Sequence, residues 1–173
     1  MLSTLDLAHN QIEYIEPGSF YNVHFLGSLD LSHNRITSLK EDHTFSGLPS
    51  LRTLSLSHNK LPYIGKGCFD ASFRLRILRL AGNKLKAVRT RWFPPIQGRR
   101  MLSTLDLAHN QIEYIEPGSF YNVHFLGSLD LSHNRITSLK EDQCNQFNVN
   151  LWATTGVRIE GNPIRCTCSI VWI

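Results

Sequence analysis

The sequence lacks any uninterrupted apolar run close to the roughly 18 residues that a membrane-spanning helix needs. Its first residues also lack the basic segment followed by an apolar stretch that marks a secretory signal peptide. No Asn-x-Ser/Thr glycosylation acceptor occurs. Neither a spanning segment nor a signal peptide is therefore visible in these 173 residues. Hydrophobic residues make up 42% of the chain, which is enough to bury a core.

Cysteine is scarce, and acidic residues are missing from one long segment. The four cysteines, Cys68, Cys144, Cys166 and Cys168, are too few and too unevenly placed for a small disulfide scaffold. The terminal Cys-x-Cys supplies two of the four ligands that zinc requires, so no metal site is predicted. Between Ala71 and Arg100 there are nine basic residues and no acidic one, although the net charge is only +4. This segment could attract an acidic partner.

Catalytic motifs are also absent from the sequence. There is no nucleophile–base–orienter set, no phosphate-binding loop and no His-Glu-x-x-His pattern. We therefore expect neither an enzyme nor a cofactor.

What the sequence does contain is repetition at two lengths. Residues 1–42 return unchanged as residues 101–142. A shorter phrase, L-x-x-L-x-L-x-x-N-x-[IL], recurs every 24 to 28 residues. Four of these shorter units span 100 residues, so the long duplication keeps the phrase in phase. The asparagines of the phrase are Asn10, Asn34, Asn59, Asn83, Asn110, Asn134 and Asn162.

The chemistry of the phrase predicts its local structure. Alternation in a short strand points its two inner leucines to one side and the residues between them to the other. The asparagine, with a donor and an acceptor, suits a ladder that bridges successive turns after the strand. A phenylalanine follows in five units and predicts a second buried stack. These phenylalanines are Phe20, Phe45, Phe69, Phe93 and Phe120.

The phrase resembles the leucine-rich repeat over essentially the whole chain. This resemblance implies an α/β solenoid, or horseshoe, with a parallel sheet on its concave face and irregular or short-helical segments on its convex side. Residues 1–142 would hold six repeats, and residues 143–173 a degenerate last repeat and the start of a cap. The parent protein would resemble Toll-like receptor, chaoptin-like or neuronal repeat ectodomains.

The end "GNPIRCTCSIVWI" resembles the start of the cysteine-rich C-terminal cap of extracellular leucine-rich repeat proteins. In that family the two cysteines pair with two further ones downstream, which makes Cys166 and Cys168 disulfide candidates. The resemblance implies a secreted or cell-surface parent. Met1 duplicates the interior residue Met101, so we expect the chain to begin inside a longer protein, with the leucines of its first repeat bare. Membrane contact would come only through an anchor elsewhere in that parent.

The outward positions of the strands are the candidate binding surface, because they can vary without disturbing the core. They form an arginine centre flanked by aspartates. One interpretation is contact with an acidic protein or a sulfated glycan. The other is local pairing, for example of Arg79 with Asp106. Mixed charge argues against nucleic acid as a partner. The candidate residues are Arg52, Arg76, Arg79, Asp6, Asp30, Asp106 and Asp130.

Two further features allow alternatives. The histidines before the ladder asparagines could stack and bind a metal or respond to pH, or they are simply part of the repeat phrase. In "RWFPPIQGRR", residues 91–100, Trp92 is either exposed on a binding loop or buried with Phe93 in the convex stack. Cys68, beside Phe69, fits a small buried residue.

Taken together, the sequence favours non-catalytic binding of a protein or glycan by a cell-surface or secreted repeat protein. A purely structural or engineered repeat scaffold without its own ligand is the first alternative, because a verbatim copy of 42 residues is more than any fold would dictate. An intracellular repeat scaffold is the second.

Overall fold

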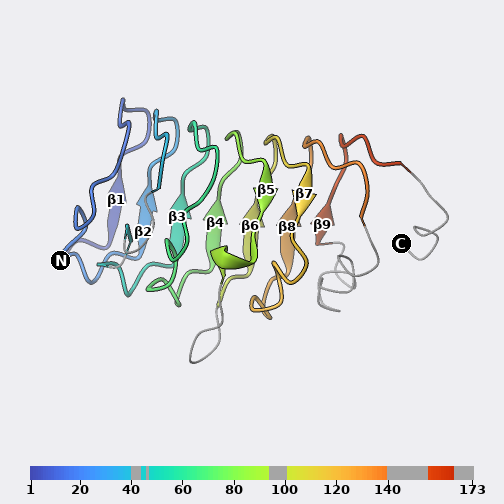
Figure 1. Cartoon of the computed structure of the whole chain (residues 1–173). Helices are drawn as coiled ribbons and strands as arrows, with labels where there is room; N and C mark the ends of the chain where they lie inside the picture. Colours follow the sequence, from blue (N-terminus) through green and yellow to red (C-terminus); the bar gives the residue numbers. More distant parts are fainter. Residues whose placement is uncertain (40–43, 46, 94–100, 140–155, 166–173) are drawn as a thin grey trace.

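The computed structural model describes residues 1–39, 44–45, 47–93, 101–139 and 156–165. Its main feature is a seven-stranded parallel sheet with strand order β1-β2-β3-β4-β6-β8-β9 (Figure 1). Consecutive repeats supply neighbouring strands, so the chain advances as a solenoid from the N-terminus at one end. The strands are β1 (Thr4–Asp6), β2 (Ser28–Asp30), β3 (Thr53–Ser55), β4 (Ile77–Arg79), β6 (Thr104–Asp106), β8 (Ser128–Asp130) and β9 (Val157–Arg158).

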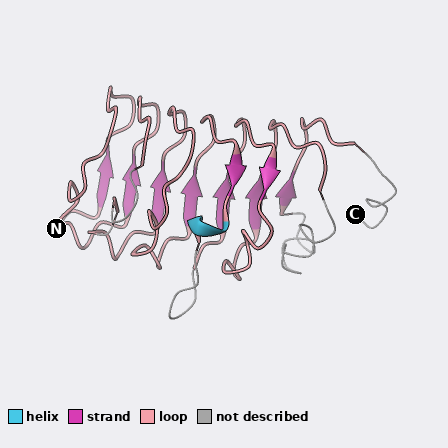
Figure 2. Ribbon diagram, viewed as in Figure 1, coloured by secondary structure: helices cyan, strands magenta, loops and turns pink. Residues whose placement is uncertain are grey.

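The return segments carry little regular structure. A two-stranded parallel sheet pairs β5 (Ala87–Val88) with β7 (Tyr114–Ile115). The single helical turn within the described ranges is the 3-10 helix η1 (Thr90–Trp92), drawn in cyan in Figure 2. The predicted leucine-rich repeat solenoid, with a parallel sheet on one face and irregular returns on the other, is therefore confirmed.

The register of the sheet follows from the repeated phrase. Leu29, in the centre of β2, faces Leu5 on one side and Leu54 on the other, and the same column continues through Leu78 and Leu105. From Leu29 onward each of these side chains has 0% of its surface exposed. Because side chains alternate along a strand, the flanking residues of each triplet point away from the core. The sheet therefore presents its variable residues outward.

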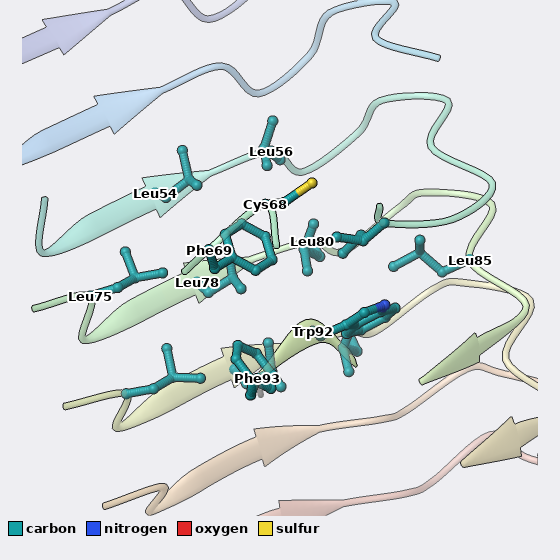
Figure 3. Close-up of a cluster of buried hydrophobic side chains, with 14 of the residues drawn as sticks. Leu54, Leu56, Cys68, Phe69, Leu75, Leu78, Leu80, Leu85, Trp92 and Phe93 are labelled. Atoms are coloured by element: carbon teal, nitrogen blue, oxygen red, sulfur yellow. The ribbon is translucent and has the colours of Figure 1, made fainter. Parts of the chain in front are cut away.

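Phenylalanines form the second buried stack behind the sheet. The Phe20, Phe45, Phe69 and Phe93 rings follow one another with centroids 6.1 to 6.2 Å apart. Trp92 and Phe93 belong to the same cluster of buried side chains as Leu78 and Leu80 (Figure 3), so the buried alternative for this tryptophan is confirmed. The Cys68 thiol is also buried and donates to the Leu39 carbonyl at 3.8 Å.

The two identical segments have different surroundings. Leu102 is 2% exposed, because the fourth repeat packs against it, whereas its copy Leu2 is 50% exposed at the N-terminal end. The apolar layer of the first repeat is thus partly bare, as expected. Of the predicted cap the structure describes residues 161–165, whereas Cys144, Cys166 and Cys168 lie outside the described residues.

Candidate functional site

The asparagines of the phrase join neighbouring turns by hydrogen bonds. Asn59 is buried, and its Nδ2 donates to the Leu31 carbonyl of the preceding repeat at 2.9 Å and to the Leu56 carbonyl of its own repeat at 3.0 Å. Its Oδ1 accepts from the Ile36 N–H at 2.9 Å. The same bonds to a preceding repeat recur at Asn34, Asn83, Asn110, Asn134 and Asn162.

Asn10 differs from the other ladder residues. Its Nδ2 donates only to the carbonyls of Leu7 and Ala8 in its own repeat, and its side chain is exposed. The hydrogen-bond geometry therefore gives this set of asparagines a structural task, with the first member contributing least.

The candidate aspartates also have a local task. Asp6, Asp30, Asp106 and Asp130 each use Oδ1 to accept the N–H two residues later, at 2.8 to 3.1 Å. This side-chain bond closes the turn that follows the strand. Asp130 in addition pairs its Oδ2 with Arg158 of the next strand at 3.2 Å. These carboxylates thus support the turns, a role the sequence pattern Asp-x-Ser or Asp-x-Ala could have indicated.

The arginines of the candidate surface lie close together on β3 and β4. Arg52 and Arg76 precede these strands, and the Arg76 N–H donates to the Arg52 carbonyl at 2.8 Å. They line a cavity of about 260 Å³ with Arg74 and Met101. Among the described residues, none of Arg52, Arg74, Arg76 and Arg79 forms an ion pair. The guanidinium groups of this cluster therefore have no carboxylate at ion-pair distance in the part of the chain that the structure describes.

A shallow cavity of about 440 Å³ extends this cluster toward the N-terminal repeats. Arg52 and Arg74 line it together with Ser3, Ser50 and the aromatic Phe25, which is 59% exposed. Sequence reasoning missed Arg74 and Phe25 as surface residues. Both stand directly before the buried first leucine of a phrase, Leu26 or Leu75, where the strand alternation no longer applies, so the pattern carried no signal for them.

Arg79 occupies the centre of the sheet face. The register places it between Ser55 and Asp106. No ion pair joins Arg79 to Asp106, although both lie in the described part of the chain. Burial alone would raise the pKa of Asp30, but hydrogen bonds from Ser32 and Ser55 and the charge of Arg79 hold it below its ordinary value.

The histidines before the ladder asparagines do stack. His9, His33 and His58 lie with ring centroids 4.3 Å apart, and each adopts a positive φ of 53° to 55°. The pKa of His33 lies below its ordinary value because of partial desolvation and repulsion from His58 and His9, against the opposing charge of Asp30. Within the ranges that the structure describes, no group of three His, Cys, Asp or Glu side chains could hold a metal ion.

The histidine stack ends where glycine takes the same place in the repeat. Gly82 has φ +68°, and a Cβ there would lie 2.5 Å from the His58 Nδ1. The last imidazole therefore lies over bare backbone.

Among the residues that the structure describes, no helix has the length and apolar character of a membrane span.

Comparisons with known proteins agree with this architecture. Mouse podocan-like protein 1 is 31% identical over 121 residues, which is 67% of this chain and 20% of that protein. A crystal structure of a TLR13–ssRNA13 complex superposes with a TM-score of 0.79 at 24% identity, covering 96% of this chain and 26% of that chain. The latter likeness shows the fold alone, and this chain spans about a fifth and a quarter of the two relatives. The sequence pattern named Leucine rich repeat matches residues 1–61, 26–85, 73–136 and 100–148, so the chain belongs to the leucine-rich repeat family.

Proposed function

We propose that this chain binds an acidic partner, a protein or an acidic glycan, without catalysis. The binding surface is the arginine cluster of β3 and β4, made of Arg52, Arg74, Arg76 and Arg79. The observation that carries the proposal is that Arg52, Arg74 and Arg76 line one cavity next to β4, the strand of Arg79, and that these four exposed residues form no ion pair within the described residues. Arginine's planar fork suits carboxylate and sulfate oxygens.

The flanking residues support a partner of limited extent. Asp30 and Asp106 bound the cluster on both sides of the sheet face, so a long uniform polyanion would meet repulsion there. Phe25 offers an aromatic contact next to the arginines.

A single-stranded RNA is named in the complex of the structural neighbour. RNA is therefore a competing ligand in the test rather than our proposal.

We propose a secreted or cell-surface location for the parent protein. The Cys-x-Cys cap pattern supports this, since such caps depend on disulfides that form outside the cytosol. The experiment compares the electrophoretic mobility of the mature parent protein on gels with and without a reducing agent. A protein with disulfides changes mobility on reduction, whereas an intracellular repeat scaffold would not.

Binding is tested by salt elution from a heparin column and by titration with acidic peptides and RNA. Arg76→Ser with Arg79→Ser is expected to elute at clearly lower salt than the wild type, because two contacts to anionic groups are lost. The matched control is Arg35→Ser with Lys60→Ser, two exposed cations of the neighbouring repeats with the same total charge. If the two double variants elute at the same salt concentration, the attraction depends only on total charge and the proposal is wrong.

The verbatim copy of residues 1–42 favours a second candidate, a repeat scaffold with no ligand of its own. The same experiment separates it. A scaffold predicts that neither double variant changes binding to any peptide, glycan or RNA offered.

A further inference from the structure

The arginines that precede β3 and β4 lie between two exposed apolar residues. The cavity of about 440 Å³ is lined by Arg52, Arg74 and Phe25, and the cavity of about 260 Å³ is lined by the same two arginines, Arg76 and Met101. Because they share two lining residues, the cavities adjoin and form one groove, which we call the edge groove. Phe25 is 59% exposed and Met101 is 38% exposed, so each end of the groove offers an apolar contact.

The order of the strands gives the length of the edge groove. Phe25 precedes β2, Arg52 precedes β3, Arg74 and Arg76 precede β4, and Met101 precedes β6. These four strands are consecutive neighbours in the sheet (Figure 1). Since neighbouring strands lie about 4.8 Å apart, the two apolar residues are separated by about 14 Å along the sheet, with the arginines midway.

The backbone beneath the arginines is held by hydrogen bonds across the repeats. The Arg52 carbonyl accepts the N–H groups of Arg76 and Ile77 at 2.8 and 3.0 Å. The Arg76 carbonyl accepts those of Ser103 and Thr104 at 2.9 and 3.0 Å. A partner therefore meets cations on an ordered backbone, which lowers the entropy cost of binding.

The aspartates of the sheet face lie at the other end of the strands. Asp30 and Asp106 are the last residues of β2 and β6, whereas Arg52 and Arg76 come directly before the first residues of β3 and close to that of β4. Three residues of strand, about 10 Å, separate these two positions. This distance is close to the Debye length of about 10 Å in 0.1 M salt, so the aspartates weaken the positive field at the groove only in part. Among the described residues, neither cavity has a carboxylate in its lining.

We propose that the edge groove binds a protein partner through an extended segment with the pattern apolar–x–acidic–x–apolar. An extended chain rises about 3.3 Å per residue, so about 14 Å corresponds to about four residue steps. Its side chains alternate, so the first, third and fifth residues face the groove together. The third residue then meets the arginines, and the outer two contact Phe25 and Met101. This inference rests on the proposed function and adds the class and the spacing of the partner.

A protein segment fits the edge groove better than a glycan does, because both ends of the groove are apolar. Aromatic residues, methionine and arginine are the residue types enriched where proteins bind proteins. The planar guanidinium groups suit a carboxylate between the two apolar contacts. A sulfated glycan carries polar groups along its whole length and would place them against Met101, where no charge partner is offered.

The test is calorimetric titration of the whole chain with two end-capped pentapeptides of identical composition and charge. One has the order Leu-Asp-Glu-Asp-Leu, and the other has the order Asp-Leu-Leu-Glu-Asp, which puts the leucines side by side. We expect the first peptide to bind about tenfold more tightly, because only its leucines reach both ends of the groove. General attraction to the arginines is the same for both peptides.

The duplicated sequence supplies a matched control for the aromatic contact. Phe25→Ala should weaken binding of the first peptide about tenfold. Phe125→Ala alters the same residue in the identical copy, where it is exposed but lines neither cavity, and should bind within about twofold of the wild type. Equal effects of the two replacements would contradict the groove assignment. If Phe25→Ala does not fold, the comparison of the two peptides on the wild type still decides.

The outcomes separate this inference from the proposed function. If the two peptides bind equally while Arg52→Ser with Arg74→Ser weakens both, the spacing is wrong and the proposed function stands. If neither peptide binds and Arg76→Ser with Arg79→Ser elutes from heparin like its control, both proposals are wrong. Tighter binding of a sulfated disaccharide or of a short single-stranded RNA than of the first peptide would overturn the assignment to a protein partner.

Discussion

Asn10 and Asn110 stand in the same 42-residue sequence, so the pair measures what a neighbouring repeat adds to the ladder. Asn110→Ala removes the acceptor of the Leu85 N–H, now 3.1 Å from Oδ1, and leaves that buried donor without a partner. The Leu80 carbonyl loses one of its two donors but keeps Asn83. One orphaned buried N–H costs about 1–3 kcal/mol, so we expect a loss near 2 kcal/mol. Asn10→Ala orphans no N–H and should cost at most about 0.5 kcal/mol.

Thermal unfolding followed by circular dichroism measures this difference. For a chain of this size 2 kcal/mol corresponds to a fall in Tm of about 4–8 °C for Asn110→Ala, against about 1–2 °C for Asn10→Ala. Equal shifts for the two variants would refute the argument that the bond across the repeats carries the effect. A longer chain with residues 43–100 placed before Met1 gives the reverse control, because Asn10 then has the sequence surroundings of Asn110 and its replacement should become equally costly.

Three other perturbations have clear expected outcomes. Gly47→Ala places a Cβ 2.4 Å from the backbone carbonyl oxygen of Phe20 and should lower Tm by several degrees, whereas Gly127→Ala, with nothing within 4 Å, should leave it unchanged. Phe69→Ala opens the middle of the ring stack and should cost about 3–5 kcal/mol in denaturant unfolding. The pKa of His33 is depressed in the folded state, so the neutral imidazole contributes its full share to the stability of the fold when the pH is above the ordinary pKa of histidine. This contribution is lost as the pH falls below that value. Tm should therefore drop more between pH 7.5 and 5 in the wild type than in His33→Asn, and parallel curves would contradict this.

The repeated phrase was sufficient to predict the strands and the core. Leu29 and Leu54 are buried and in register because the phrase places each leucine at the same point of its unit. The burial of Trp92 with Phe93 was one of two alternatives, since the sequence does not show whether a longer connection projects or folds back. The stacking of Phe93 on the Phe69 ring follows from the repeat pattern. The burial of Trp92, at 1% exposed, is the part that the pattern left open.

The site was harder to predict, because it depends on what lies one repeat away. The sequence identified the arginines, but the neighbours of a charge on one strand are residues about 25 positions before and after it in the sequence. Whether the charge is paired depends on those residues. Arg79 adjoins Asp106 in register and still forms no ion pair with it, while Asp130 does pair with Arg158. Pairing in a sheet thus limits which charges can meet, and side-chain rotamers decide which do.

Arg79 and the cations within residues 86–91 belong to the same repeat but to opposite sides of it, and this separation follows from the leucine spacing. Leu78 of β4, Leu80 and Leu85 are all fully buried, so the chain between them must pass around the turn at Asn83 and carry the next charged residues to the other side. A single basic segment of sequence therefore produces two positive surfaces. Each can be altered alone, because the buried side chains of Leu78, Leu80 and Leu85 lie between them. Sequence charge counts combine these two surfaces into one, and only the position of each residue within its repeat separates them.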